Sequence, residues 1–378
     1  MNFDLSDEQR LLQDSLNRFV AERCDFHKRL KAMAEPEGYS PATWKALADL
    51  GVLGLRFAEE DGGFGCGPVE TMVVMEALGR GLVIEPYFST AVLAGGALRI
   101  AAGPSQKAGR IEAIVAGDHR MALAHNEPGG PRHTVDRLAT AARATADGWC
   151  LEGAKTAVLH GGTADEFIVS ATSRSGVSLF LVPADTAGVR VTARTGYDGN
   201  GVAEVKFDDV PLPPDALLGA EGGGPAILTA LFEEANAALA AEAVGIMADI
   251  LETTIDYLKT RTQFGVAIGS FQALQHRAVD MLMEVELARS MAILAALSLE
   301  RPAGERRLNI AAAKARIGRA GRFVGQQAVQ MHGAIGLTSE YKVGHAFKRL
   351  TAIDALFGDS DHHLEELAQA DGLVPIGS

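Results

Sequence analysis

The sequence contains only three cysteines in 378 residues, and they lie far apart, at Cys24, Cys66 and Cys150. None belongs to a CxxC or CxxH pair, so the sequence offers neither a disulfide framework nor a thiolate ligand set for zinc. This usage is typical of proteins from a reducing compartment, and we therefore expect a cytoplasmic protein.

Long apolar runs and runs of basic residues are also missing. No stretch approaches the ~18 uninterrupted apolar residues that a membrane span requires. Residues 1–24 follow an amphipathic pattern in which Ser6 and Gln9 fit a capping box, unlike the apolar centre of a signal peptide. The formal net charge is -13, which disfavours binding to a phosphate backbone. We therefore expect neither a membrane span nor a nucleic-acid partner.

The spacing of apolar residues divides the chain into three ranges. In residues 1–115 they recur every three or four positions, which indicates helices. Residues 116–220 change to short β-rich runs separated by Gly, Pro and Asp. Residues 221–378 return to the helical period. The sequence predicts an α+β multidomain chain with an N-terminal helical domain, a middle β-barrel or sandwich domain, and a C-terminal four-helix bundle.

Particular segments carry this division. The strand-like runs are residues 166–169, 177–182 and 203–207. The helical period of the last range breaks near residues 262–270, 302–304 and 332–338. These breaks separate four helices, most of roughly 20 residues or more, which is the length typical of a bundle.

Two motifs in the last range combine groups suited to phosphates and aromatic rings. RTQFG, at 261–265, follows a predicted helix end, where an Arg fork can bind phosphate oxygens and an aromatic face can stack on a ring. QMHGAIG, at 330–336, ends a long helix in a glycine-rich turn that can bring backbone N–H groups close to a ligand. Each motif alone also fits a polar corner or a helix C-cap. His332, inside the second motif, fits packing better than catalysis.

Taken with two further motifs, the chain resembles the acyl-CoA dehydrogenase family over essentially its whole length. The further motifs are NEPGG at 126–130 and FDDVPLP at 207–213. The resemblance implies flavin adenine dinucleotide (FAD), an acyl-CoA substrate, an electron-transfer acceptor and α,β-desaturation, in which a carboxylate removes the α-proton. It also implies a set of cofactor-binding residues: Arg261, Phe264, Gln272, Gln330, Gly333 and Ala334.

The family's catalytic carboxylate is missing from both of its usual positions. Counting from Gln330 places Phe357 where most members carry Glu, and counting back from Arg261 places Ala235 where a second subgroup carries it. Asn236 stands where the family usually has an Arg. The catalytic residue therefore remains unassigned.

Two nearby carboxylates are weak candidates for a replacement base. Glu234 lies one position before Ala235, but a helix step of about 100° turns its side chain away from that point. Asp359 lies two positions after Phe357 and takes the place of a hydroxyl residue.

The middle range departs from the family pattern as well. The resemblance places Ala157 and Leu159 where the family has a Trp over the flavin and a Thr that hydrogen-bonds near flavin N5. An apolar Leu cannot donate a hydrogen bond. After NEPGG the sequence continues with residues 131–133 and lacks the usual small hydroxyl residues. His125 and His160 flank these segments and have no assigned role.

The motifs that survive suggest a division of labour between subunits. In homo-oligomeric members the corner and the helix-end turn reach the neighbour's FAD, whereas the strand contacts and the base serve the chain's own FAD. The resemblance therefore favours a subunit of a hetero-oligomer that completes its partner's FAD site. The alternatives are a self-sufficient homotetramer with an unusual base, a flavin monooxygenase or oxidase of the same fold, and a non-catalytic scaffold.

One segment near the C-terminus, DALFGDSDHH, gathers acidic residues and histidines. A metal site would need Asp359, Asp361, His362 and His363 to converge, but successive helix residues diverge by about 100°, so we expect no metal. A helix start, with Ser360 or Asp359 as N-cap and Asp361 in the first turn, fits better. A polar contact with flavin or pantetheine is the remaining alternative.

Overall fold

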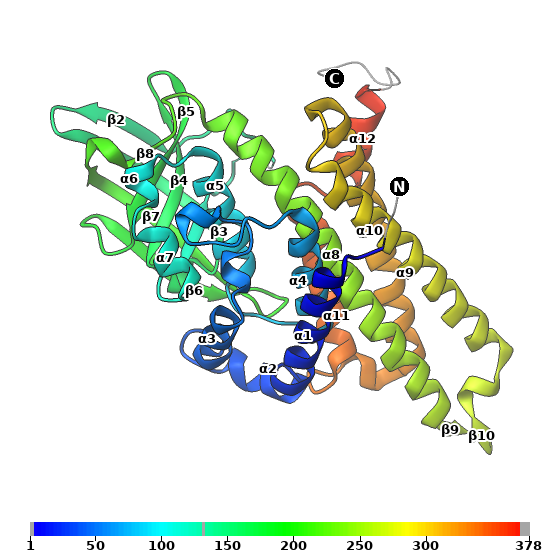
Figure 1. Cartoon of the computed structure of the whole chain (residues 1–378). Helices are drawn as coiled ribbons and strands as arrows, with labels where there is room; N and C mark the ends of the chain where they lie inside the picture. The colour runs from blue at the N-terminus through cyan, green and yellow to red at the C-terminus, as the bar shows by residue number, and fades with distance from the viewer. Residues whose placement is uncertain (1–3, 131–132, 371–378) are drawn as a thin grey trace. The chain divides into compact units, whose positions relative to one another are not determined.

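The computed structural model describes residues 4–130 and 133–370, and Figure 1 shows their path. Expectations for residues 1–3, for Pro131 and Arg132 after NEPGG, and for residues 371–378 lie outside the described residues. Within the described ranges, no helix is both long enough and apolar enough to cross a membrane.

The chain forms two compact units, each built from separated stretches of sequence. The helical unit comprises Met1–Arg29, Pro68–Val83 and Asn236–Ser378, and the β unit comprises Leu30–Gly67 and Ile84–Ala235. The units are defined by contacts and not by chain order, so the three predicted domain ranges stay a prediction.

The helical unit contains the long helices of the chain (Figure 1). They are α1 (Asp7–Arg23), α4 (Pro68–Gly81), α9 (Gln272–Ser298), α10 (Ala303–His332), α11 (Lys342–Ala355) and α12 (Ser360–Ala370), while α2 (Phe26–Met33) and α8 (Gly224–Thr260) contribute to both units. The three predicted breaks all fall between these helices. The predicted capping box of α1 is present, because Ser6 Oγ accepts from the Gln9 N–H and Gln9 Oε1 accepts from the Ser6 N–H.

Glycines allow α4 and α8 to pack closely in the helical unit. A Cβ added at Gly245 would overlap the backbone carbonyl of Glu76. A Cβ at Gly79 would likewise overlap the carbonyl of Glu242. The two helices therefore approach backbone to backbone, at a distance that larger residues would prevent.

The β unit holds a mixed sheet and short helices. Its helices are α3 (Pro41–Asp49), the π-helical turn η3 (Phe88–Ala94), α5 (Gly95–Ala101), α6 (Pro104–Lys107) and α7 (Arg110–Val115). Its strands are β1 (Met121–Ala124), β2 (Ala141–Thr145), β3 (Gly148–Leu159), β4 (Glu166–Ser173), β5 (Gly176–Pro183), β6 (Val189–Thr195), β7 (Gly201–Leu212) and β8 (Leu217–Leu218).

The strand order decides between a barrel and an open sheet. The strands follow the path β6-β7-β3-β2-β4-β5-β8, and β1 pairs in parallel with β4. Among the described strands, β6 and β8 lie at the two ends of this path and do not pair with each other, so the sheet is not closed and the barrel alternative is wrong. Strand β8 is only two residues long and β6 is largely exposed, so neither edge presents a long apolar strand for closure.

The core of the β unit follows from strand patterning. Strands β4 and β5 are buried almost throughout, as expected for short apolar runs covered on both faces, and they contribute Phe167 and Phe180. In strand β7, Ala203, Val205 and Phe207 are buried and the residues between them are exposed, so one face of the strand meets the core. The predicted runs 166–169, 177–182 and 203–207 lie within these three strands.

Candidate functional site

The corner motif RTQFG forms a tight hairpin after α8. Thr262–Gln263 pairs with Val266–Ala267, and the two turn residues, Phe264 and Gly265, have φ of 55° and 80°. A left-handed conformation is common for Gly and unfavourable for Phe. The side chain of Phe264 is 91% exposed in the chain alone. Phe264 is thus a strained and exposed aromatic residue at the tip of the hairpin.

The glycine-rich turn lies close to this corner in the helical unit. Helix α10 ends at His332, and Gly333 follows with φ of 66°. The His332 ring stacks on Tyr257, in the last turn of α8, with centroids 4.5 Å apart, and lies 5.1 Å from the Tyr341 ring. This stack joins the ends of α8 and α10 to the start of α11. His332 is buried and its Nδ1 faces the Ala328 carbonyl at 2.8 Å, which supports a packing role.

The predicted cofactor-binding residues lie on the corner and the turn, and all are exposed. They are Arg261, Phe264, Gln272, Gln330, Gly333 and Ala334. The ring stack brings the first three near the last three, although about 60 residues separate the two motifs. The structure therefore assembles these residues into one exposed region of the helical unit.

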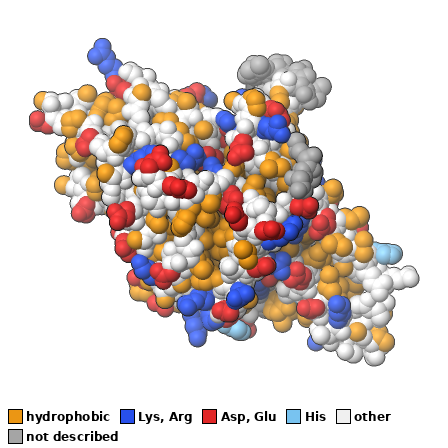
Figure 2. Space-filling view, in the orientation of Figure 1, with side chains coloured by type: hydrophobic (Ala, Val, Ile, Leu, Met, Phe, Trp, Pro, Cys, Tyr) orange, Lys and Arg blue, Asp and Glu red, His pale blue; other side chains and the backbone are white. Residues whose placement is uncertain are grey.

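Large apolar side chains surround this region. Phe271, Val266, Ile335 and Leu337 are exposed near the corner and the turn, and Leu337 is 75% exposed. Helix α9 adds a stripe on one helix face, made of Val279, Leu282, Met283 and Leu287. Figure 2 shows hydrophobic side chains at the lower right, over the ends of α8 and α9. Contiguous exposed apolar surface of this kind is typical of a protein interface.

The segment that carries the catalytic Glu in most family members forms the turn between α11 and α12. Phe357 has φ of 53° and Gly358 has φ of 101°. The Asn236 amide donates to the Phe357 carbonyl at 3.2 Å, and His363 Nε2 lies 3.2 Å from the same oxygen. Asn236 Oδ1 is buried and has no hydrogen-bond partner among the described residues. The segment is thus held firmly but presents a phenyl ring where a base would act.

The nearby carboxylates are engaged in other contacts. In the β unit, Glu234 forms ion pairs with Arg99 on α5 and with Arg56, the latter at 3.8 Å. Asp359 caps α12, because its Oδ1 accepts from the His362 N–H at 2.9 Å. To take a substrate proton, each of these carboxylates would have to come within hydrogen-bond reach of it. Both weak candidates therefore stay predictions, and their present partners are Arg99, Arg56 and the α12 backbone.

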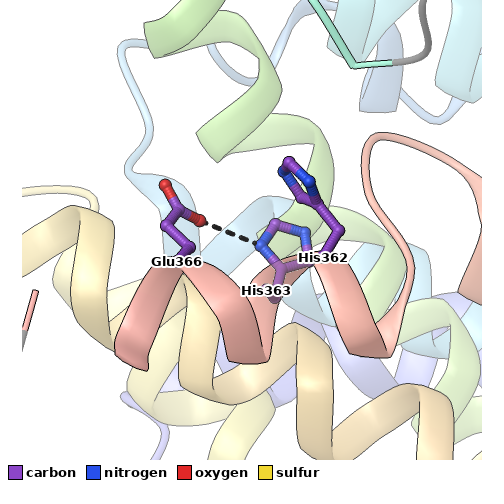
Figure 3. A group of neighbouring side chains, drawn as sticks. All are labelled: His362, His363 and Glu366. Atoms are coloured by element: carbon purple, nitrogen blue, oxygen red, sulfur yellow. Dashed lines mark hydrogen bonds and ion pairs between the residues drawn. The ribbon is translucent and has the colours of Figure 1, made fainter. Parts of the chain in front are cut away.

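Helix α12 confirms the predicted helix start and regroups its polar residues. Asp359 is the cap and Asp361 lies in the first turn. The metal-type set found in the described residues is His362, His363 and Glu366, whose ligand atoms lie within 4.8 Å of one another. Figure 3 shows the contact between His363 Nδ1 and Glu366, at 3.2 Å. The two aspartates do not join this set.

Glu366 is already neutralised without a metal. Arg307 on α10 pairs with it in addition to His363. Burial alone would raise the pKa of Glu366, but the hydrogen bonds from His363 and Arg307 outweigh burial and lower the pKa to about 2. His363 also faces the Phe357 carbonyl. The contacts of His363, Glu366 and Arg307 therefore stabilise the α11–α12 turn.

The β unit contains a buried ion pair behind the NEPGG loop. Lys155 on β3 is fully buried, and its Nζ donates to Glu127 Oε1 at 2.8 Å and to the His125 carbonyl at 3.0 Å. Glu127 also accepts from the N–H groups of Ala139 and Thr140. Burial would raise the pKa of Glu127, but these hydrogen bonds lower it to about 2. The pair ties the loop to the sheet.

His125 lies beside this pair as a neutral side chain. Its Nε2 lies 2.8 Å from the Thr134 carbonyl, so Nε2 carries the proton and Nδ1 accepts from the Ser170 hydroxyl at 2.8 Å. Burial and the charge of Lys155 lower its pKa to about 4. A neutral histidine with both ring nitrogens occupied fits a structural role.

The two altered positions of β3 lie at its far end. A bulge between Lys155 and Val158 puts Ala157 in the left-handed region, with φ of 51°. Leu159 pairs with Val202 on β7. Neither side chain supplies an aromatic face or a hydrogen bond. His160, which follows with φ of 52°, is buried and lies edge-on to Tyr39 at 6.3 Å.

Models of one protein family match nearly the whole chain. Acyl-CoA dehydrogenase family models match in order: the N-terminal domain at residues 6–118, the middle domain at 122–210 and the C-terminal domain at 222–371. The chain belongs to the acyl-CoA dehydrogenase family. Membership supports FAD as its cofactor and places it among flavin-dependent oxidoreductases.

Individual members of the family align over nearly the full chain. Acyl-CoA dehydrogenase FadE27 of Mycobacterium tuberculosis is 31% identical over 335 residues, covering 86% of this chain and 87% of FadE27. The ChsE4-ChsE5 complex from Mycobacterium tuberculosis contains a chain with TM-score 0.89 and 26% identity, covering 99% of this chain and 100% of that one. The FAD complex of PigA gives TM-score 0.90 and 27% identity, with coverage of 99% and 100%.

The residues of this family member fit FAD only in part. On the helical unit, the exposed Arg261 and Phe264 offer a guanidinium and an aromatic face, which suit a pyrophosphate and a ring. On β3, Ala157 and Leu159 offer neither an aromatic ring nor a hydrogen-bond donor. The two sets therefore differ in what they can hold.

Two residues described above, and the fully buried Lys314 of α10, could not be found as functional candidates from the sequence. Lys155, Arg99 and Lys314 each gain their meaning from partners that are distant in the chain. The available signal was weak: Lys314 lies with Arg316 in the largely apolar run IAAAKARIG of α10, where an exposed lysine would be unremarkable. Only its complete burial distinguishes it.

We expect Arg261→Ala to weaken flavin retention in the assembled protein. A charged hydrogen bond is worth roughly 1.5 to 3 kcal/mol, so the flavin Kd should rise about 10- to 150-fold. Since Arg261 is exposed, the variant should fold normally. Flavin absorbance after gel filtration measures the effect, with Lys259→Ala at the end of the same helix as the control. Equal flavin retention in wild type and Arg261→Ala would make the corner purely structural.

Proposed function

We propose that this chain is one subunit of a hetero-oligomeric acyl-CoA dehydrogenase and completes the FAD site of its partner. Its helical unit presents Arg261, Phe264 and the glycine-rich turn to the partner. The assembly desaturates an acyl-CoA thioester at the α,β position and passes electrons to an electron-transfer acceptor. When bound, FAD supplies the acceptor for the hydride that leaves the β-carbon.

The observation that carries this proposal is the contrast between the two halves of the cofactor set. The corner and turn are intact, clustered and exposed, together with an apolar stripe on α9 that needs a covering surface. The strand positions Ala157 and Leu159 and the base position Phe357 lack the groups that a chain's own FAD and substrate require. A chain with these features can assist a neighbouring site better than it can operate its own.

Two solved structures that resemble this chain support the proposal of a two-subunit assembly. One similar chain belongs to the ChsE4-ChsE5 complex, and another to the Tcur3481-Tcur3483 steroid acyl-CoA dehydrogenase, at TM-score 0.88 and 28% identity. The names of both structures join two different components. We extend that arrangement to this chain and place it in the cytoplasm, in keeping with three cysteines that form no disulfide.

The carboxylates test whether this chain supplies the base. In the complex purified with its partner, Glu234→Gln and Asp359→Asn, and also Glu233→Gln at the residue before Glu234, should each reduce the rate by well under the ~100- to 10,000-fold that follows removal of a general base. The assay is bleaching of the flavin on addition of acyl-CoA. Glu252→Gln, which alters an exposed ion pair with Arg80, is the matched control.

Two outcomes would favour the alternatives. A loss of that size from Glu234→Gln or Asp359→Asn, with flavin still bound, would make that residue the base of a self-sufficient enzyme. If the native protein purifies without any second dehydrogenase-like chain and carries no flavin, a non-catalytic scaffold is the better description.

A further inference from the structure

Lys314, in the middle of α10, contacts the backbone of the α11–α12 turn and is fully buried. Its Nζ donates to the carbonyls of Asp354 at 2.9 Å, Leu356 at 2.9 Å and Gly358 at 2.6 Å. An ammonium group has three N–H donors, and three carbonyl oxygens receive them. Burial lowers the pKa of Lys314 to about 8, against the opposing effect of Asp354 and Asp359, so the ammonium form prevails at pH 7.

Further contacts secure the same turn from other sides. The Asp354 carboxylate accepts from both the N–H and the hydroxyl of Ser360, and it pairs with Arg322, two helical turns beyond Lys314. Gly318 lies between them on α10, and a Cβ at this position would overlap Asp354 and Ser360. Lys314, Gly318 and Arg322 lie about one helical turn apart on one face of α10, and this face packs against the α11–α12 turn.

The turn so held contains an unfavourable backbone conformation. Phe357 has φ of 53°, in the left-handed region that a bulky residue avoids. Such a conformation persists only where surrounding contacts determine it. The carbonyls on both sides of Phe357, those of Leu356 and Gly358, are two of the three that accept from Lys314. The Phe357 carbonyl itself faces Asn236 and His363.

We propose that Lys314 is the positioning residue for position 357. Its ammonium holds the 354–358 backbone in the left-handed turn, so the side chain at 357 leaves the backbone in one fixed direction. In most family members this position carries the base, and here the same support is applied to Phe357. The proposal depends on contacts within the helical unit and not on the partner-subunit function, so either can fail without the other.

The test compares Gly and Ala at position 357, because both remove the phenyl ring and differ in their tolerance of a left-handed backbone. With Lys314 present, Phe357→Gly should have a folding equilibrium constant on the order of fivefold larger than Phe357→Ala. With Lys314→Met the turn is released, and the ratio should fall to about one or below, because Gly loses more freedom on folding. Urea unfolding followed by helical circular dichroism gives both ratios.

Two controls separate positioning from general destabilisation. Lys348→Met removes an exposed lysine on α11 and should preserve the fivefold ratio. Ile310→Ala weakens the packing of α10 on α8 and α9 through Ala237 and Ala295, without touching the turn, and should also preserve it.

A ratio that stays near fivefold in Lys314→Met, or a ratio near one in the wild-type background, overturns the proposal. If Lys314→Met does not fold, the same comparison in Lys314→Gln decides, since the amide keeps two N–H donors. An intermediate ratio there supports the proposal, and an unchanged ratio overturns it.

Discussion

Purified without a partner, the chain is expected to retain little or no flavin. At the β3 positions, the missing aromatic contact is worth about 0.5–1.5 kcal/mol and the missing hydrogen bond about 0.5–1.5 kcal/mol. Together they weaken binding by about 1–3 kcal/mol, or roughly 5- to 150-fold in Kd. The absent partner removes a second set of contacts. The ratio of flavin to protein absorbance after gel filtration measures retention.

A gain-of-function variant sharpens this test. Leu159→Thr restores a hydroxyl at the altered position and should increase flavin retention of the isolated chain. Val202→Thr makes a similar change on the facing strand, at the residue paired with Leu159, and should have no such effect. Full flavin occupancy of the unaltered chain on its own would count decisively against the partner-subunit proposal.

Glu127→Gln is expected to lower the free energy of unfolding of the β unit by about 3–5 kcal/mol at pH 7. Breaking a buried ion pair leaves the other charge uncompensated, and here that charge is the fully buried Lys155. Urea unfolding followed by the fluorescence of Trp149, which packs against Phe180 in this unit, measures the loss. Glu152→Gln, in an exposed pair on the same strand, should cost at most about 1 kcal/mol.

The loss from Glu127→Gln should depend on pH in a defined direction. The pKa of Glu127 is lowered from 4.5 to about 2 in the folded protein. The unfolded chain therefore binds the proton first as the solution is acidified, and the stability that Glu127 contributes is lost between pH 4.5 and pH 2. The difference between the stabilities of wild type and Glu127→Gln should narrow as the pH falls through that range. A difference that does not change with pH would exclude the pair as its cause.

Local pattern was sufficient to predict the elements that depend on neighbouring residues. Ser6 and Gln9 form a capping box across one helical turn, and the breaks after Thr260, Ser298 and His332 follow from Gly, Pro and polar residues nearby. These contacts span a few residues, so sequence spacing determines them. The corner and the glycine-rich turn were recognised for the same reason.

The open form of the sheet and the internal supports of the site were decided only by tertiary structure. The strand runs 166–169, 177–182 and 203–207 indicate where strands lie, but pairing order depends on which edges meet, and β6 and β8 do not. The contact of Glu234 with Arg99, 135 residues away, likewise could not be predicted from local sequence.

The two buried lysines show most clearly what the local sequence cannot predict. Lys155 pairs with Glu127 across 28 residues, and Lys314 binds carbonyls 40 to 44 residues away. Nothing in the local sequence separates these lysines from solvent-exposed ones. A buried ammonium is tolerated only where packing brings acceptors to it, because its desolvation must be offset by hydrogen bonds. That condition is a property of the folded chain, and the position of Phe357 depends on it.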